Sequence, residues 1–293
     1  MNKINSFKDA DNHIALLLVK SAKQKLKKKN FIAALKDTDK AIELNDKLSS
    51  AYFIRGEIFC SNDTFTVLTK LKNQENALKN YNIAIQIDPN SPENFEGRGK
   101  LYFKQAKYGA AKNDFTNAIT LMKADSLILK PDPLDQFPLM SFSLFERRGQ
   151  ANFKLGQYEE ARMDFSKVLE LSELAEPSIL SEIYSFNEID ILESRGYANL
   201  KCGYFKEAID DLSLLLTDSD NPTDFNKHLL RAVAYANNEN YELALDDIST
   251  ATNINENCFK ENEHFLEDLP DDFKGILKIY LPQKYLEDLD LSI

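Results

Sequence analysis

The chain has 293 residues, of which 43% are hydrophobic and 11% aromatic, a composition typical of a globular protein. Glycine and proline number only nine each, fewer than a loop-rich β protein needs, so helices are favoured. The formal net charge of −11 opposes binding to nucleic acid or anionic lipid, because affinity for either grows with lysine and arginine contacts.

Cysteine usage and hydropathy indicate a soluble protein of a reducing compartment. The three cysteines, Cys60, Cys202 and Cys258, are far apart and odd in number, which provides neither a disulfide framework nor a zinc knuckle. Near the N-terminus an apolar run spans only Ile14 to Val19, with charges on both sides and no small-residue cleavage site. No run of 18 apolar residues occurs. We therefore expect a cytoplasmic protein without membrane insertion.

An internal repeat is the strongest signal in the sequence. A small residue is followed by alanine twelve positions later, and by a small or medium apolar residue seven positions after that. Five triplets keep this spacing: Ala22/Ala34/Ala41, Gly99/Ala111/Ala118, Gly149/Ala161/Val168, Gly196/Ala208/Leu215 and Ala232/Ala244/Ala251. A sixth, Gly56/Ala77/Ala84, keeps the seven-residue step but has nine extra residues before it.

Each unit therefore predicts two antiparallel helices joined by a short turn. A small side chain on the first helix lets the backbone of the second come close, and bulky side chains fill the remaining space. An aromatic residue precedes the middle alanine by three positions in five units, at Phe31, Tyr108, Tyr158, Phe205 and Tyr241. In two of the turns, Gly156 and Gly203 fit a helix C-cap, where glycine tolerates a positive φ.

Residues 88–121, DPNSPENFEGRGKLYFKQAKYGAAKNDFTNAITL, resemble a tetratricopeptide repeat (TPR) motif, and the pattern is similar in all six units. The resemblance implies an all-α, right-handed α-solenoid of helix-turn-helix repeats. Three departures occur: the proline that closes a repeat is clear only at Pro89, Lys25 stands where a large residue is usual, and Leu215 replaces the last alanine of the fifth unit.

In chain order, we expect an N-terminal extension at 1–14, a solenoid at 15–258 and capping helices at 259–293 that cover the last repeat. The units lie near 15–48, 49–91, 92–125, 142–175, 189–222 and 225–258, with insertions at 61–76, 124–140 and 175–189. The first insertion is a loop or a helix extension. The second is irregular because it holds three prolines, and the third could lengthen the next helix by about three turns.

Chemistry-bearing residues are sparse. Only His13, His228 and His264 could serve as bases or metal ligands, and nothing in the repeat brings them together. No phosphate-binding loop, zinc-protease helix, calcium loop or nucleophile elbow occurs. We therefore expect a protein that is not an enzyme and needs no cofactor or metal. The basic run at 20–29 is either a solvated helix end or a dock for an acidic partner.

The resemblance implies that the first helices line a concave groove that holds peptides or helices of partner proteins. Three sets of residues, each at the same position in successive units, would face the groove. One set is acidic, one apolar and one basic. Its predicted binding residues are Phe53, Glu96, Lys100, Phe103, Lys104, Glu146, Phe153, Lys154, Glu193, Tyr197 and Lys201. The predicted function is a scaffold or adaptor that binds a peptide or helix carrying charges of both signs.

Other interpretations stay open at this point. The site could lie on the convex face or on the insertions, or an insertion could fill the groove. The protein could also be an accessory or targeting subunit of an enzyme complex, similar to a co-chaperone, or an enzyme whose active site is built in the inserted loops. The lysine and asparagine clamp that holds chaperone C-termini is missing, because Val19, Lys23 and Ile54 occupy the corresponding positions. The oligomeric state is left undetermined.

Overall fold

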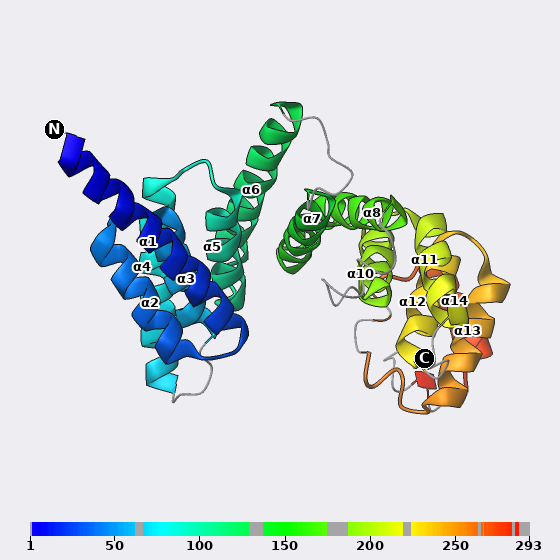
Figure 1. Ribbon diagram of the computed structural model, residues 1–293. Coiled ribbons are helices and arrows are strands. Elements are labelled where there is room, and N and C mark those ends of the chain that lie inside the picture. Colours follow the sequence, from blue (N-terminus) through cyan, green and yellow to red (C-terminus); the bar gives the residue numbers. More distant parts are fainter. Residues whose placement is uncertain are drawn as a thin grey trace. The chain divides into compact units, whose positions relative to one another are not determined.

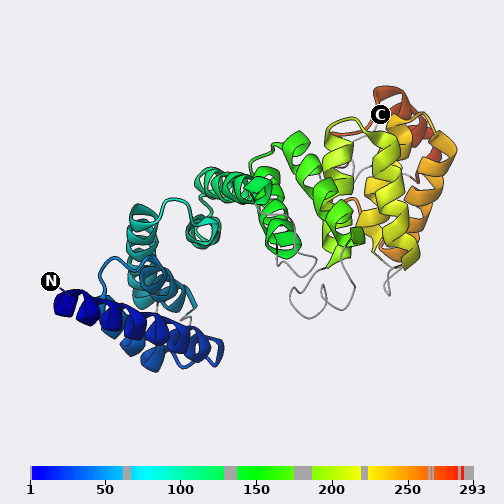
Figure 2. The same cartoon turned by 45° about the horizontal axis from the view of Figure 1, so that its top comes forward.

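The computed structural model describes a set of ranges, namely residues 2–61, 67–128, 137–174, 187–218, 224–262, 265, 267–282 and 285–286. Within these ranges the regular structure is helical, with no strand. The chain divides into two compact units, Met1–Ala151 and Asn152–Ile293, called unit 1 and unit 2 below. Figures 1 and 2 show the helices of each unit side by side as hairpins.

Unit 1 begins with three helical hairpins. Its helices are α1 (Asn2–Lys27), α2 (Phe31–Leu44), α3 (Ser49–Ser61), α4 (Val67–Ile87), α5 (Pro92–Lys104), α6 (Tyr108–Ile128) and most of α7 (Phe137–Lys154). The pairs are α1 with α2, α3 with α4, and α5 with α6; in addition, α2 contacts α3 and α4 contacts α5. Residues 2–14 continue α1, and the later part of the first insertion extends α4.

Unit 2 holds the remaining helices, α8 (Tyr158–Leu174), α10 (Glu188–Lys201), α11 (Phe205–Asp218), α12 (Phe225–Asn237), α13 (Tyr241–Ile254) and α14 (Asp271–Tyr280). Here α10 pairs with α11 and α12 with α13, while α8 contacts α10 and α11 contacts α12. The middle of the second insertion (129–136) and most of the third (175–186) lie outside the described residues, and so does the helix extension predicted there.

The small residues allow the close helix approach that the repeat predicts. A Cβ atom placed on Gly99 of α5 would lie 2.7 Å from Cε1 of Phe115 on α6. A Cβ on Gly56 of α3 would lie 2.8 Å from Cε1 of Tyr81 on α4. Both rings are fully buried. In these two hairpins an aromatic ring on the second helix fills the space that a glycine leaves on the first.

The turns within the hairpins share one backbone geometry. Gly156 and Gly203 have φ values of 70° and 81°, which confirms the predicted C-caps. The same position of three other turns holds Lys29, Ala106 and Glu239, with φ values of 57°, 56° and 61°. In all five turns the next amide donates to the carbonyl oxygen five residues earlier, at 2.8–2.9 Å. The hydrogen bonds of the turn impose the left-handed conformation even where the residue is not glycine.

In four units an arginine just before the small residue joins its helix pair to the preceding pair: Arg55, Arg98, Arg195 and Arg231. The Arg98 guanidinium donates to both carboxylate oxygens of Asp114, at 2.7 and 2.8 Å, and so joins α5 to α6. Its third nitrogen donates to Asn82 on α4 at 2.8 Å. Arg55 on α3 similarly contacts Asn80 of its own pair and Asp39 of the preceding pair. One side chain therefore holds three helices together.

The same arrangement recurs in unit 2. Arg231 donates to both carboxylate oxygens of Asp247, each at 2.8 Å, and to Ser213 of the preceding pair at 3.1 Å. Asp247 also lies 2.8 Å from Nδ1 of His228. Burial would raise the pKa of Asp247, but the hydrogen bonds from Arg231 and His228 outweigh burial and lower it. The carboxylate stays charged although it is almost completely buried.

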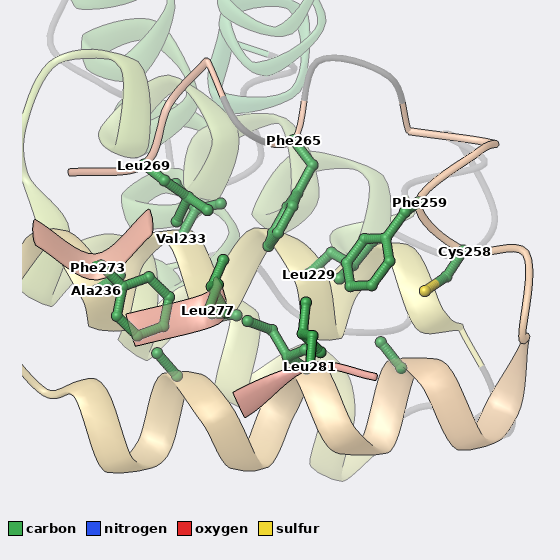
Figure 3. Close-up of a cluster of buried hydrophobic side chains, with 14 of the residues drawn as sticks. Leu229, Val233, Ala236, Cys258, Phe259, Phe265, Leu269, Phe273, Leu277 and Leu281 are labelled. Atoms are coloured by element: carbon green, nitrogen blue, oxygen red, sulfur yellow. The ribbon is translucent and has the colours of Figure 1, made fainter. Parts of the chain in front are cut away.

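The C-terminal segment covers the last repeat, as expected of a solenoid end. Phe273 and Leu277 of α14 are fully buried, in one cluster with residues of α12 and α13. Figure 3 shows Phe265, Phe273 and Leu277 gathered with Leu229 and Val233 of α12. Among the described residues this cap is one helix, α14, with irregular backbone before it.

Replacing Gly99 tests the close approach of the helices. Because the new methyl group would meet the Phe115 ring, we expect Gly99→Ala to lower the free energy of unfolding by about 1–3 kcal/mol. Gly109→Ala in α6 is the matched control, since no atom lies within 4 Å of its Cβ position. It should leave stability unchanged or raise it by up to about 1 kcal/mol. Urea unfolding followed by circular dichroism measures both, and similar changes would contradict the packing argument.

Removing Arg231 tests the arginine contact between repeats. Arg231→Met leaves the buried Asp247 without its main partner, so we expect a loss of about 3 kcal/mol in unfolding free energy at neutral pH. The loss should shrink as the pH falls through the lowered pKa of Asp247, where the carboxylate is protonated in both proteins. Lys167→Met removes an exposed pair with Glu170 and should cost under about 1 kcal/mol. Equal losses for the two variants would refute the role given to Arg231.

Candidate protein-binding surface

Unit 1 holds six of the predicted groove residues, and most of their groups are engaged within the unit. The ring of Phe53 lies 6.0 Å from that of Tyr81, and its Cε2 atom lies 2.9 Å from the position that a Cβ on Gly97 would take. Phe53 therefore packs α3 against α4 and α5. It is a core contact more than an exposed anchor.

Two of the predicted charged residues on α5 form an ion pair with each other. Lys100 forms an ion pair with Glu96 one turn earlier, at 2.5 Å, and 14% of the Glu96 side chain is exposed. Phe103 is half-buried, with its ring edge-on to Tyr108 at 5.1 Å. Lys104 lies exposed at the end of α5. On α7, Glu146 accepts a hydrogen bond from Gln150 at 3.0 Å.

Unit 2 brings aromatic groove residues together. The rings of Phe153 and Tyr197 lie 5.4 Å apart, and that of Tyr158 lies 5.5 Å from Phe153 and 5.8 Å from Tyr197. All three are half-buried, and we call them the aromatic cluster. Burial raises the pKa of Tyr197, so this phenol is neutral at physiological pH. The cluster joins the end of α7 to α8 and α10.

Two of the predicted lysines lie on the helices that carry this cluster. Lys154 follows Phe153, is exposed, and makes no ion pair to any residue that the structure describes. The Lys201 ammonium lies 5.4 Å from the centre of the Tyr197 ring, in a cation–π contact. Glu193 lies one turn before Tyr197 and 3.9 Å from Lys227, and burial raises its pKa.

The C-terminal segment reaches back to these side chains. Lys201 forms an ion pair with Asp268, at 2.5 and 2.6 Å to the two carboxylate oxygens. Burial would lower the pKa of Lys201, but the hydrogen bond to Asp268 outweighs burial and raises it. Asn237 on α12 donates to the backbone carbonyl of Asp268 at 2.7 Å. The Tyr241 hydroxyl donates to the carboxylate of Asp272.

A pocket of about 390 Å³ lies between α10, α12 and this segment. Its lining is mixed: it includes the apolar residues Leu229, Leu230 and Phe265 and the polar residues Asn262 and Asp268. Tyr197 of the aromatic cluster also lines it, so the pocket continues the surface that the cluster begins. The sequence predicts a cap at the end of the array, but it does not predict that this cap forms one wall of a pocket.

Metal-binding clusters and membrane-spanning helices are both missing from the described residues. They contain no group of three or more His, Cys, Asp or Glu side chains that could hold a metal ion. No helix among them is both long and apolar enough to cross a bilayer. His13 is exposed and His228 is engaged with Asp247, while His264 lies outside the described residues.

Comparison with protein families decides the identity of the repeat. A TPR repeat model matches residues 67–105, and a tetratricopeptide repeat model matches residues 143–173. The chain is a tetratricopeptide repeat protein. The first match spans α4 and α5, and the second covers most of the fourth unit. Both matches therefore fall on helices for which the residue spacing predicts a repeat. A search of curated protein sequences gives no match.

Solved structures support the same fold for the TPR array. YrrB, described as a TPR protein with an unusual peptide-binding site, is 21% identical, with a TM-score of 0.54 over 75% of this chain and 92% of its own. PilF of Pseudomonas aeruginosa is 14% identical, with a TM-score of 0.53 over 84% and 94%. MamA is 15% identical, with a TM-score of 0.50 over 72% and 94%. At these identities the likeness shows the fold alone.

Reversing one charge tests the contact between the cap and the array. Asp268→Lys should repel Lys201 and increase amide hydrogen exchange in residues 258–286 by at least about tenfold. Adding Lys201→Glu restores opposite charges and should return exchange most of the way to the wild-type rate. Asp271→Lys, at an exposed position of the same segment, is the control. If both single variants exchange alike, the Lys201 contact does not hold the segment.

Proposed function

We propose that this TPR protein is a non-catalytic interaction scaffold that binds a peptide or helix of a partner protein on unit 2. The binding surface consists of the aromatic cluster, Lys154 and the adjoining pocket. The observation that carries this proposal is the cluster itself, because three half-buried rings meet and one of them, Tyr197, also lines a pocket of mixed apolar and polar residues. Aromatic side chains that stay partly accessible on a rigid base supply much of the affinity in protein interfaces.

The charges around the cluster favour a ligand that carries both signs. Lys154 is exposed and available to an acidic group. The Glu193 side chain is 48% exposed and makes a long ion pair of 3.9 Å with Lys227, so its carboxylate can also accept a basic group. An apolar side chain of the ligand would enter the pocket beside Leu230 and Phe265. A dissociation constant in the micromolar range, about −8 kcal/mol, would be ordinary for such a contact.

The groove residues of unit 1 have a weaker claim to binding. Phe53 is held between helices, and Glu96 and Lys100 already satisfy one another. A ligand there would have to compete with these internal contacts. We therefore assign the main binding role to Phe153, Lys154, Glu193 and Tyr197.

The peptide-binding site named for YrrB supports the class of function, since the two proteins share the fold. Action in the cytoplasm is part of this proposal, and it is supported by the odd number and wide spacing of the three cysteines in the sequence. The role of an accessory subunit of an enzyme complex belongs to the same class of binding function. It differs only in the identity of the partner.

The experiment compares partners captured by three forms of the full chain. Wild-type protein should retain a partner that the variant Tyr197→Ala loses by at least about tenfold, because an aromatic anchor contributes on the order of 2 kcal/mol. Lys154→Glu should weaken binding and reduce its dependence on salt. Tyr280→Ala, on an exposed ring of α14, is the control. Retention of every partner by Tyr197→Ala and Lys154→Glu would refute this surface.

A further inference from the structure

One face of α1 differs from the same face of every other first helix. In five units the residue five positions before the small residue is buried: Ala51, Asn94, Leu144, Ile191 and Lys227. Asn94 shows what this face meets, because its amide donates to the carbonyl of Ala84 on the preceding helix α4. The equivalent residue of α1 is Leu17, and 53% of it is exposed.

Neighbouring positions on α1 show the same difference. Two positions after the small residue, Ile58, Leu101, Ala151, Ala198 and Ala234 are buried, whereas the equivalent Gln24 is exposed. Just before the small residue, where other units have the arginine that reaches back to the preceding pair, α1 has Ser21. Ile14, one turn before Leu17, is 47% exposed. Together Ile14, Leu17, Ser21 and Gln24 form what we call the open face.

The two ends of the array therefore differ in how far their outer faces are buried. At the other end, α14 buries Phe273 and Leu277 completely against the last pair. A terminal repeat that presents its stacking face to solvent usually carries a polar surface there. The open face instead keeps two large aliphatic side chains at helical spacing, a pattern suited to a partner helix.

The charge around the open face indicates what kind of helix fits. Five lysines of α1 and its turn, Lys20, Lys23, Lys27, Lys28 and Lys29, are exposed, and none forms an ion pair with a described residue. Lys25, in contrast, pairs with Asp37 on α2. A second copy of α1 would bring lysines against lysines, which is unfavourable. An acidic helix would gain both apolar contact and opposite charge.

We propose that the open face of α1 binds an acidic amphipathic helix of a partner protein, which stacks on Leu17 as the second helix of one repeat stacks on the next. This site lies in unit 1 and does not depend on the peptide surface proposed for unit 2. It assigns the basic run at 20–29 a role in binding, one of the two interpretations that the sequence left open.

The test uses the full chain and a defined probe. The probe is a fluorescent synthetic helix of about 18 residues, with leucines at alternating three- and four-residue steps and glutamates beside them. We expect micromolar binding by fluorescence anisotropy, weakened at least about tenfold by Leu17→Asp and several-fold by Lys20→Glu. Leu243→Asp is the matched control, because Leu243 is 48% exposed on α13, and it should bind as wild type.

Several outcomes would overturn the proposal. These are equal binding by Leu17→Asp, equal binding of a probe whose glutamates are replaced by lysines, and a wild-type dimer that Leu17→Asp dissociates in sedimentation. The last would make a second copy the occupant. Circular dichroism checks that α1 remains folded, and if Leu17→Asp unfolds it, Leu17→Gln replaces it in the same comparison with the same expected loss.

Discussion

The close approach of two helices at a residue without a side chain is the contact on which the rest of this structure depends. At Gly56 and Gly99 an added methyl group would overlap the rings of Tyr81 and Phe115. Because the rings fill the space that the glycines leave, these two hairpins are closely packed at their centres, which favours one helix spacing. The distances between helices, and with them the positions of all outward-facing residues, follow from these size pairs.

The arginine contacts build on that spacing. A guanidinium can reach an aspartate on its own pair and a polar group on the preceding pair only if the three helices keep fixed distances. Arg98, Arg195 and Arg231 each do so, with carboxylates that are almost completely buried. Apolar packing alone does not fix the orientation of the helices. These contacts do, because burying a carboxylate without its partner costs free energy. At the first helix the series stops with Ser21, and so does the burial of the stacking face.

Binding and packing compete for the same aromatic side chains. Phe53 lies three positions before the small residue of its helix and Tyr197 one position after it, one turn apart on the same helix face. Phe53 is wedged between helices, while Tyr197 belongs to a cluster that borders a pocket. The difference comes from neighbours. Gly97 leaves room for the Phe53 ring, whereas the rings of Phe153 and Tyr158 hold Tyr197 beside them. The neighbouring side chains therefore help to decide whether an aromatic residue on this helix face packs between helices or borders a pocket.

The sequence alone determined the helical hairpins, the small residues at their centres and the glycine turns, because these depend on residues within one unit. The arginine contacts were also within its reach, since an aspartate follows Arg98, Arg195 and Arg231 at a constant sixteen residues. Only the tertiary structure decided that Asp268 pairs with Lys201, 67 residues away, and that the cap walls a pocket. That pairing depends on the course of the irregular backbone after α13. This segment lacks the repeat pattern, so the pattern does not predict its course. The exposure of Leu17 likewise depends on which elements pack against α1. The spacing of residues within one unit does not predict those neighbours.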